Sequence, residues 1–343
     1  MEWQKYINLN AVKDWMDQQG LGRGAIESPH LLTGGTQNFL LHFKRDCREY
    51  VLRRPPAHLR KNSNSTMLRE SRILAALAGS DVPHPGLIAS CADENVIGAC
   101  FYLMEPVDGF NPTGKLSAYH QAPEVQRRMG FALVDAIAAL GAIDYKSVGL
   151  EDFGRPDGFI DRQVPRWRGQ LESYCEHENW PGPSSLPGVE ELTLWLERNK
   201  PSDLQPGIFH GDFHFGNVMY RHDSPELAAI VDWELSSIGD PLIDLGWLMS
   251  GWPLDDGETF DAVSPWNGFP TLDEMIARYG ERSGRNLDHL TWYGVLACFK
   301  LGTILEGTFA RACAGKAPKE TGEQLHGYSL RLFKRGLSFI ARA

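Results

Sequence analysis

Short β-type segments alternate with polar turns in the amino-terminal part of the chain. After a helical pattern around residues 10–19, three segments rich in β-branched and aromatic residues predict strands, separated by turn-forming polar residues. Residues 66–78 then show helical periodicity, and two more strand-like segments flank a turn at residues 93–95. The expected strands are residues 26–32, 37–43, 49–53, 86–91 and 97–105. This part of the chain therefore predicts an antiparallel βββαββ lobe preceded by a helix.

Helical periodicity dominates from about residue 111 onward. The expected helices are residues 125–143, 189–198, 242–249, 271–282, 287–314 and 320–342. Two brief strand-like segments, 207–210 and 227–232, interrupt them, and each ends in a polar cluster. The order of elements predicts an α+β protein with a small β-rich lobe over residues 1–106 and a larger, mainly helical lobe over residues 107–343.

Composition and charge narrow the classes of partner. The 343 residues are 42% hydrophobic and 23% charged, which is typical of a globular protein with a full core. Because 44 Asp and Glu outnumber 34 Lys and Arg, the formal net charge is −10. This negative charge disfavours binding to nucleic acids and to anionic membranes.

Targeting and cysteine patterns point to a reducing compartment. No run approaches the roughly 18 apolar residues of a membrane span, and the first residues lack the pattern of a signal peptide, so we expect a cytoplasmic location. The six cysteines are scattered without a C-x-x-C pair. This spacing argues against both a zinc knuckle and a disulfide framework.

Two polar clusters carry the candidate chemistry. The first is H-G-D-F-H-F-G-N at residues 210–217, and the second is I-V-D-W-E at residues 230–234. Amide and carboxylate oxygens are hard ligands that suit Mg²⁺, and this ion keeps several waters, so it needs few ligands from the protein. We therefore expect Asn217 and Asp232 to hold Mg²⁺. Asp212 is then free to accept the proton of an incoming hydroxyl, as the catalytic base.

The spacing of these clusters resembles a known family. The motif H-G-D-x-x-x-x-N, followed by I-V-D-W-E and G-D-P-x-x-D-L, resembles the aminoglycoside phosphotransferase family of the protein-kinase-like superfamily, over about residues 26–340. With V-L-R-R-P-P at residues 51–56, the chain is more closely similar to the phosphotransferase-like domain of acyl-CoA dehydrogenase family members. The resemblance implies a two-lobed protein-kinase-like fold that binds ATP or GTP with Mg²⁺. It also implies transfer of the γ-phosphoryl group to a hydroxyl of a small molecule.

A glycine turn and an ion pair are expected to hold the nucleotide phosphates. Gly34 and Gly35, next to Thr36, lie between two predicted strands, where backbone N–H groups can approach phosphate oxygens. Arg53 occupies the place on the third strand where kinases carry a phosphate-binding lysine, and a guanidinium can hold phosphate in a bidentate manner. Glu70 shares a helix face with apolar residues and needs a cationic partner, for which Arg53 is the candidate.

The segment that joins the lobes is expected to hold the adenine base. Because Pro106 has no N–H, the Glu105 carbonyl and the Val107 amide are the available acceptor and donor. These two backbone groups would complete the nucleotide site.

Residues near the two clusters are expected to have supporting roles. By resemblance, His210 packs and orients the catalytic loop, and Asp244 braces it. His214 is expected to be an exposed bystander, whereas for Glu234 a metal-assisting role stays open. The loop-like stretch 252–270 is expected to form a substrate wall or lid rather than core.

Two other classes of protein stay open at this point. A non-catalytic nucleotide-binding module is one, because Arg53 replaces lysine. A metallophosphoesterase is the other, because residues 211–214 read G-D-F-H, although no G-N-H-[DE] segment follows. Sugars, amino alcohols, hydroxy acids and hydroxyacyl thioesters are all open as the acceptor, and the sequence sets no oligomeric state.

Overall fold

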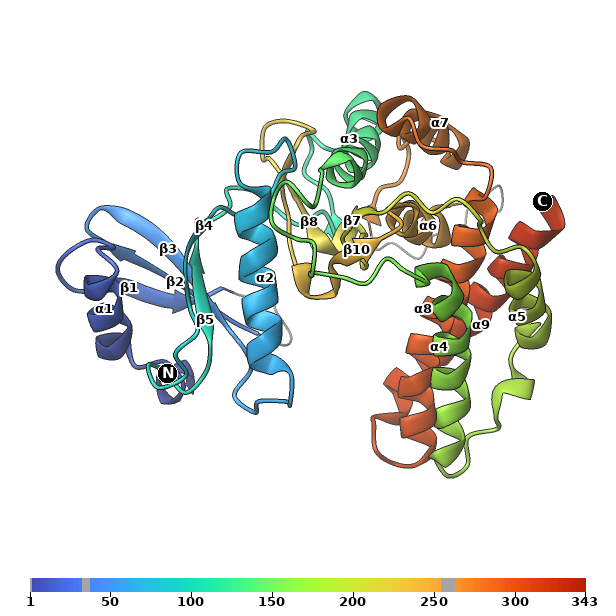
Figure 1. Cartoon of the computed structure of the whole chain (residues 1–343), viewed down its shortest axis with the longest axis horizontal. Coiled ribbons are helices and arrows are strands. Elements are labelled where there is room, and N and C mark those ends of the chain that lie inside the picture. Colours follow the sequence, from blue (N-terminus) through green and yellow to red (C-terminus); the bar gives the residue numbers. More distant parts are fainter. Residues whose placement is uncertain (1, 33–37, 254–262) are drawn as a thin grey trace.

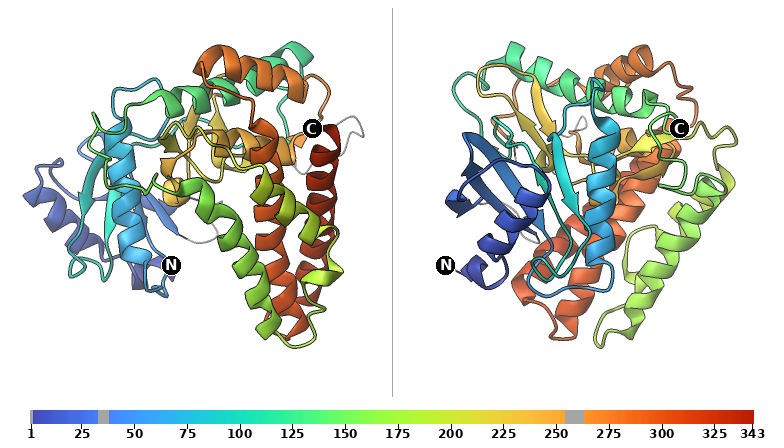
Figure 2. Two further views of the ribbon diagram at one scale, coloured as in Figure 1. Left: turned by 45° about the vertical axis from the view of Figure 1, so that its right-hand side comes forward. Right: turned by 60° about the vertical axis from the view of Figure 1, so that its left-hand side comes forward.

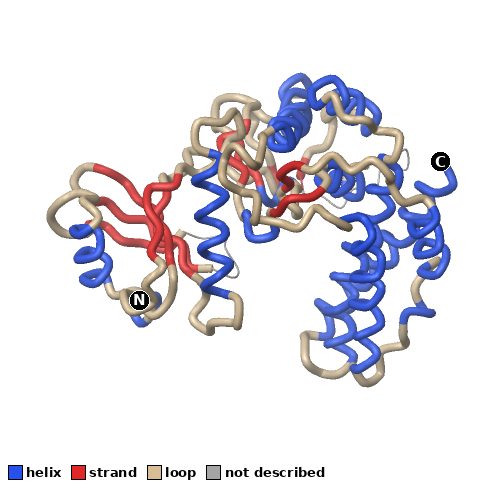
Figure 3. The backbone as a smooth tube through the Cα atoms, viewed as in Figure 1, coloured by secondary structure: helices blue, strands red, loops and turns tan. Residues whose placement is uncertain are grey.

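The computed structural model describes residues 2–32, 38–253 and 263–343. A small lobe built on one antiparallel sheet is followed by a larger lobe in which helices predominate (Figure 1). This arrangement confirms the predicted α+β class with two lobes. Strands gather in the first lobe and in a short central band, and helices make up most of the rest (Figure 3).

The first lobe contains a five-stranded sheet in the order β1-β2-β3-β5-β4, in which every neighbouring pair is antiparallel. Its strands are β1 (Glu27–Leu31), β2 (Phe39–Arg45), β3 (Arg48–Arg54), β4 (Leu87–Cys91) and β5 (Phe101–Met104). The helices of this lobe are η1 (Glu2–Lys5), α1 (Leu9–Gln18) and α2 (Ser63–Leu77).

The two faces of this sheet carry different helices. Leu52 on β3 and Leu103 on β5 pack into one apolar cluster with α1, and α2 lies on the opposite side of the sheet (Figure 1). Because side chains alternate along a strand, the next positions, Arg53 and Tyr102, face α2. The register pairs these two residues directly across β3 and β5. The alternation therefore presents the Arg53 guanidinium to α2.

The second lobe is organised around two long helices. Its helices are α3 (Pro123–Ala142), α4 (Phe159–Ser173), α5 (Val189–Arg198), α6 (Leu242–Gly251), α7 (Leu272–Ser283), α8 (Leu290–Cys313) and α9 (Lys319–Arg342). Helices α8 and α9 run side by side, and α4 and α5 lie along them (Figures 1 and 2). Close contact is possible because Gly302 on α8 faces the ring of Phe333 on α9, where an added Cβ would lie 3.0 Å from the ring.

Short strand pairs also belong to the second lobe. They are β7 (Gly207–Phe209) with β10 (Ser237–Gly239), β8 (Val218–Tyr220) with β9 (Leu227–Ile230), and β6 (Gly114–Lys115) with β11 (Val263–Ser264). The chain enters this region from β5 through residues 105–107, and Phe110 then pairs with Tyr220 of β8. The ends of β7 and β9 carry the two polar clusters.

Helix α4 is absent from the elements expected from the sequence. Pro165 lies inside it and supplies no N–H, and Gly158 precedes it in the left-handed conformation, with φ of 63°. Both residues are typical of loops in a sequence pattern. The helix forms because its apolar face, including Val164 and Leu171, is buried in the main core.

The expectation that residues 252–270 form a wall or lid rather than core is wrong for Trp252. That side chain is 1% exposed and stacks on Phe215 with 5.7 Å between ring centroids. Its indole N–H also donates to the Pro270 carbonyl at 2.8 Å. Aromatic burial therefore outweighs the loop-like composition, and residues 254–262 of this stretch lie outside the described part of the chain.

Candidate active site

The two polar clusters converge because strands β8 and β9 pair. Val218 lies opposite Ile230, and the Val231 amide donates to the Asn217 carbonyl at 2.9 Å. These bonds place Asn217, at the end of the first cluster, beside the start of the second. The hairpin of β8 and β9 thus brings together the two clusters, whose residues Asp212 and Asp232 are twenty positions apart in the sequence.

Asp212 is held by its own loop. The Asn217 side-chain amide donates to the Asp212 carbonyl at 2.9 Å and to Asp212 Oδ2 at 3.0 Å, and His214 Nε2 lies 3.6 Å from Asp212 Oδ1. Burial would raise the pKa of Asp212, but the nearby His214 imidazole and the positive charge of Lys300 outweigh it and lower the pKa. The carboxylate is ionised and oriented. His214, expected as a bystander, is one of its partners.

Two buried groups fix the backbone that carries Asp212. Asp244 accepts the His210 amide at 2.6 Å and the Gly211 amide at 2.8 Å. Burial raises the pKa of Asp244 to about 6. The His210 ring contacts the Val231 carbonyl at 3.0 Å, and burial lowers its pKa to about 4, so the ring is neutral. The expectation that Asp244 braces the loop is confirmed, and His210 lies where it orients the loop.

Arg53 joins two carboxylates. Its Nε lies 2.8 Å from Glu70 Oε2, and its Nη2 donates to Asp232 Oδ1 at 2.8 Å. Glu70 is 1% exposed and also accepts the Tyr102 hydroxyl at 2.9 Å. Burial would lower the pKa of Arg53, but the carboxylates of Glu70 and Asp232 outweigh it and raise the pKa. The ion pair predicted between Arg53 and Glu70 is present.

Oxygen ligands gather around Asp232. One carboxylate oxygen from each of Glu70, Asp232 and Glu234 lies within 4.8 Å of the others. The amide oxygen of Asn217 accepts no hydrogen bond from the described residues, and this residue adjoins the cluster through the Val231 bond. Hard oxygen donors of this kind fit Mg²⁺. The predicted ligands Asn217 and Asp232 are therefore neighbours, with Glu234 as an additional candidate.

The backbone at Asp232 is unusual. Asp232 has φ of 66° and ψ of 61°, in the left-handed region that non-glycine residues seldom adopt. The turn sends the next residue, Trp233, into the core, where it is 3% exposed and donates to the Ile230 carbonyl at 3.0 Å. The indole also lies 5.0 Å from the His210 ring. Asp232 and Glu234, on either side of Trp233, are partly exposed.

The segment between the lobes leaves two backbone groups available. The Glu105 amide donates to the Gly86 carbonyl at 2.8 Å. Among the described residues, neither the Glu105 carbonyl nor the Val107 amide has a backbone partner. These are the two groups expected to contact adenine. The expected phosphate turn at Gly34, Gly35 and Thr36 lies outside the described residues.

Lys300 is a residue that the sequence reasoning missed. Its Nζ donates to the Gly211 carbonyl at 2.9 Å and lies 4.2 Å from the ring centroid of Trp247. Burial lowers the pKa of Lys300 to about 8, although Asp212 and Asp244 act in the opposite direction. Lys300 is the one charged residue in the segment 290–304, and this is the signal that could have identified it.

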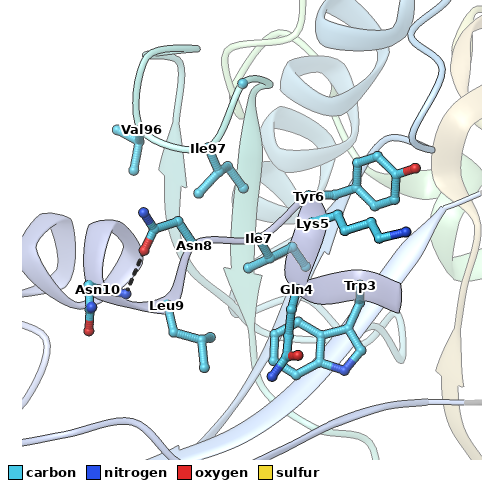
Figure 4. A pocket seen from close by; sticks show the side chains of 11 residues that line it. Trp3, Gln4, Lys5, Tyr6, Ile7, Asn8, Leu9, Asn10, Val96 and Ile97 are labelled. Carbon is cyan, nitrogen blue, oxygen red and sulfur yellow. Dashed lines mark hydrogen bonds between the residues drawn. The ribbon is translucent and has the colours of Figure 1, made fainter. Parts of the chain in front are cut away.

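Two cavities differ in their relation to this site. One, of about 950 Å³, is lined by Gly211, Glu234 and Lys300 and so opens beside the catalytic loop. The other, of about 590 Å³, lies at the amino-terminal segment around Trp3 and Asn8 (Figure 4). Among the described residues that line this second cavity there is no carboxylate. Of these two cavities, only the first adjoins the two polar clusters.

Residues 31–275 match the phosphotransferase enzyme family. The chain belongs to that family. Human acyl-CoA dehydrogenase family member 11 is 30% identical over 332 residues, which cover 92% of this chain and 41% of the relative. This chain thus spans well under half of that relative. No helix within the described residues has the length and apolar character needed to cross a membrane.

Solved structures of phosphotransferases share the fold. A Ralstonia eutropha protein assigned as an aminoglycoside phosphotransferase has a TM-score of 0.80 and 27% identity, covering 96% of this chain and 98% of the other. A thermostable aminoglycoside phosphotransferase solved with AMP-PNP and hygromycin B has a TM-score of 0.56 and 14% identity, covering 95% and 98%. At the latter identity the likeness concerns the fold alone. Both neighbours support a kinase-like phosphotransferase fold for this chain.

Proposed function

We propose that this protein transfers the γ-phosphoryl group of ATP or GTP, bound with Mg²⁺, to a hydroxyl of a small molecule. The observation that carries the proposal is the position of Asn217. Its amide fixes the Asp212 carboxylate, and its backbone carbonyl binds the strand end that leads to Asp232. A proton acceptor and a magnesium ligand are thereby held on neighbouring loops.

Each residue has a role that follows from its contacts. Asp212 orients the acceptor hydroxyl and takes its proton as the oxygen bonds to phosphorus and the bond to the departing nucleoside diphosphate breaks. Arg53, braced by Glu70, holds phosphate oxygens. Asn217 and Asp232 would hold Mg²⁺, which supplies charge neutralisation at the phosphates when bound. The backbone groups of Glu105 and Val107 would hold the base, and the sequence pattern alone assigns the covering of the phosphates to Gly34, Gly35 and Thr36.

The two alternative functions predict different behaviour. A non-catalytic nucleotide-binding module would be stabilised by ATP without consuming it in the presence of any hydroxyl compound. For a metallophosphoesterase, Asp212 and His214 should belong to a metal-ligand cluster. The cluster found among the described residues consists of Glu70, Asp232 and Glu234 instead, which counts against that alternative.

The test is ATP consumption with Mg²⁺ and a pooled library of hydroxyl metabolites, with mass spectrometry to detect an added phosphate. The wild-type protein should phosphorylate at least one compound. Asp212→Ala should still be stabilised by the nucleotide against heat but should lose turnover by about 100-fold or more. Unchanged turnover in Asp212→Ala would refute the assignment. Nucleotide binding without phosphorylation of any compound would favour the non-catalytic module.

A further inference from the structure

The cavity of about 950 Å³ lies between three helices and the catalytic loop. Arg69 of α2, Trp167 of α4 and Lys300 of α8 line it, together with Gly211 and Glu234. Its size is within the range of small-molecule sites. Gly211 directly precedes Asp212, so the cavity lies beside the loop that carries the candidate base.

Positive charge predominates on the wall of this cavity. Its cationic residues are Arg69, Arg155, Arg162, Arg166 and Lys300. Two carboxylates, Asp161 and Glu234, lie among the described residues of the wall. Asp161 has its own partner, since Lys200 Nζ lies 3.4 Å away, and Glu234 belongs to the cluster around Asp232. The excess of cations contrasts with the net charge of −10 for the chain.

Two of these cations serve the fold. Arg69 donates to the Phe153 carbonyl at 2.8 Å, and Arg162 donates to the Asp157 and Arg155 carbonyls. Their guanidinium groups tie the loop before α4 to the rest of the protein. They raise the positive potential of the wall, but part of their hydrogen-bonding capacity is used.

The other cations have donors to spare. Within residues 2–32, 38–253 and 263–343, the side chains of Arg155 and Arg166 have no ion pair and no hydrogen bond, and Arg166 lies over the Trp167 ring at 4.9 Å. Lys300 uses one N–H for the Gly211 carbonyl, and an ammonium group has three. Its Nζ lies 5.6 Å from the ring centroid of Trp167, so Trp167 contacts both cations.

Trp167 lies on the same wall, between Arg166 and Lys300. Its side chain is 8% exposed, and its indole N–H is buried without an acceptor among the described residues, so the N–H itself does not reach the cavity. Apolar side chains complete the lining, and two of them, Leu235 and Ile304, are 49% and 39% exposed.

We propose that this cavity binds the phosphoryl acceptor, and that the acceptor is an anion: a hydroxylated compound with a carboxylate or phosphate group and an apolar portion. Arg155, Arg166 and Lys300 receive the anionic group, and Leu235 and Ile304 contact the apolar portion. This inference rests on the proposed function. It separates the protein from phosphotransferases that act on polycations, because a cationic ligand would meet unpaired arginines here.

The test uses the full chain and four sets of compounds. These are short hydroxycarboxylates with the hydroxyl at successive positions, their methyl esters, hydroxyalkyl phosphates and amino alcohols. Binding is measured by calorimetry on Asp212→Asn with AMP-PNP and Mg²⁺, and phosphorylation is measured on the wild type by mass spectrometry. We expect a carboxylate or a phosphate to bind, and the matched esters and amino alcohols to bind at least about tenfold more weakly.

Two variants on the same helix locate the effect. Arg166→Gln should weaken binding of the anion by about tenfold. Arg168→Gln is the matched control, because Arg168 pairs with Glu172 at 2.8 Å and Glu190 at 3.3 Å and does not line the cavity. It should leave binding unchanged. An equal effect of both variants would overturn the assignment of the cavity.

The outcomes separate this inference from the proposed function. Phosphorylation of an ester or amino alcohol in preference to the anions would overturn the inference and leave the phosphotransferase function in place. Binding of an anion that the wild type does not phosphorylate would overturn the assignment of that anion as the acceptor, and phosphorylation of no compound in the pooled library would overturn the proposed function. If none of the anions binds, the inference is wrong.

Discussion

Arg53 on the small lobe donates to Asp232 on the large lobe at 2.8 Å while its Nε lies 2.8 Å from Glu70. One guanidinium thus connects the sheet, helix α2 and the metal-ligand cluster. The bond to Asp232 engages Oδ1, one of the two oxygens of the carboxylate that the proposed function assigns to Mg²⁺. An ion bound through Oδ1 would compete with Arg53 and would release a donor toward the phosphates.

The role of Asp232 can be tested through the dependence of nucleotide affinity on Mg²⁺. Asp232→Asn should retain the fold, since asparagine tolerates the left-handed backbone. The gain in ATP affinity on adding Mg²⁺ should fall by about tenfold or more, because a charged ligand is lost. Calorimetry with and without Mg²⁺ measures this gain. Asp223→Asn, at an exposed turn, serves as the control and should bind like the wild type.

The Arg53 ion pair should also contribute to stability. Arg53→Ala would leave Glu70, which is 1% exposed, without its cation, and removing one partner of a buried pair destabilises by about 3–5 kcal/mol. Arg48 on the same strand has an exposed partner, Glu105, at 3.1 Å. Arg48→Ala should change the free energy of unfolding by no more than about 1 kcal/mol. Urea denaturation of both variants makes the comparison, and similar losses would contradict it.

We expect the activity to fall at alkaline pH because Lys300 loses its proton. Its pKa is lowered to about 8, so the ammonium group that faces the catalytic loop loses its charge above that pH. The rate constant kcat/KM should therefore fall as the pH rises through about 8. In Lys300→Arg the fall should move to higher pH, because arginine keeps its charge. A pH–rate profile with the same alkaline limb in both proteins would exclude Lys300 as its source.

The same shift has a defined effect on stability. The folded-state pKa of Lys300 lies below the ordinary value of 10.5, so the folded protein binds fewer protons than the unfolded chain between about pH 8 and pH 10.5. The charged lysine lowers the free energy of unfolding by its full amount below pH 8. This loss disappears as the pH rises through the window, so the protein becomes more stable. Lys300→Met should remove this rise from the pH dependence of unfolding.

A pair of tryptophans tests the unpaired buried donor of Trp167. Trp167 and Trp180 are both 8% exposed, but within the described part of the chain only Trp180 has an indole partner, Glu306 at 2.8 Å. Trp180→Phe should lower the free energy of unfolding by about 1–3 kcal/mol, because a buried hydrogen bond to a charged group is lost. Trp167→Phe should change it by less than about 1 kcal/mol. Equal losses in chemical denaturation would mean that the Trp167 N–H is satisfied in the protein.

The sequence predicts those parts of the fold and site that depend on local patterns. The alternation in 49–53 places Arg53 on one face of β3, and helical spacing places Glu70 on the buried face of α2. Their meeting follows from these two periods. Asp212 and Asp232 are recognised because each lies within three residues of the end of a short apolar strand.

The acceptor side of the site depends on contacts that no local pattern encodes. Helix α4, which carries Arg166 and Trp167, is not predicted from the sequence because it contains Pro165. Lys300 reaches Gly211 across 89 positions, and its surroundings are set by the packing of α8 against α4 and α6. The positive charge of the cavity therefore follows only from the three-dimensional structure. The net charge of the whole chain, −10, is of the opposite sign.

Trp233 sets a limit on how the acidic cluster can move. Its indole is buried in the core, whereas the carboxylates of the residues before and after it in the sequence are partly exposed. Swinging Asp232 and Glu234 to other positions would extract this ring, at a cost of about 3–5 kcal/mol by analogy with truncating a buried aromatic residue. Asp232 and Glu234 would therefore keep one orientation, and any regulation of the proposed activity would have to act on another part of the protein.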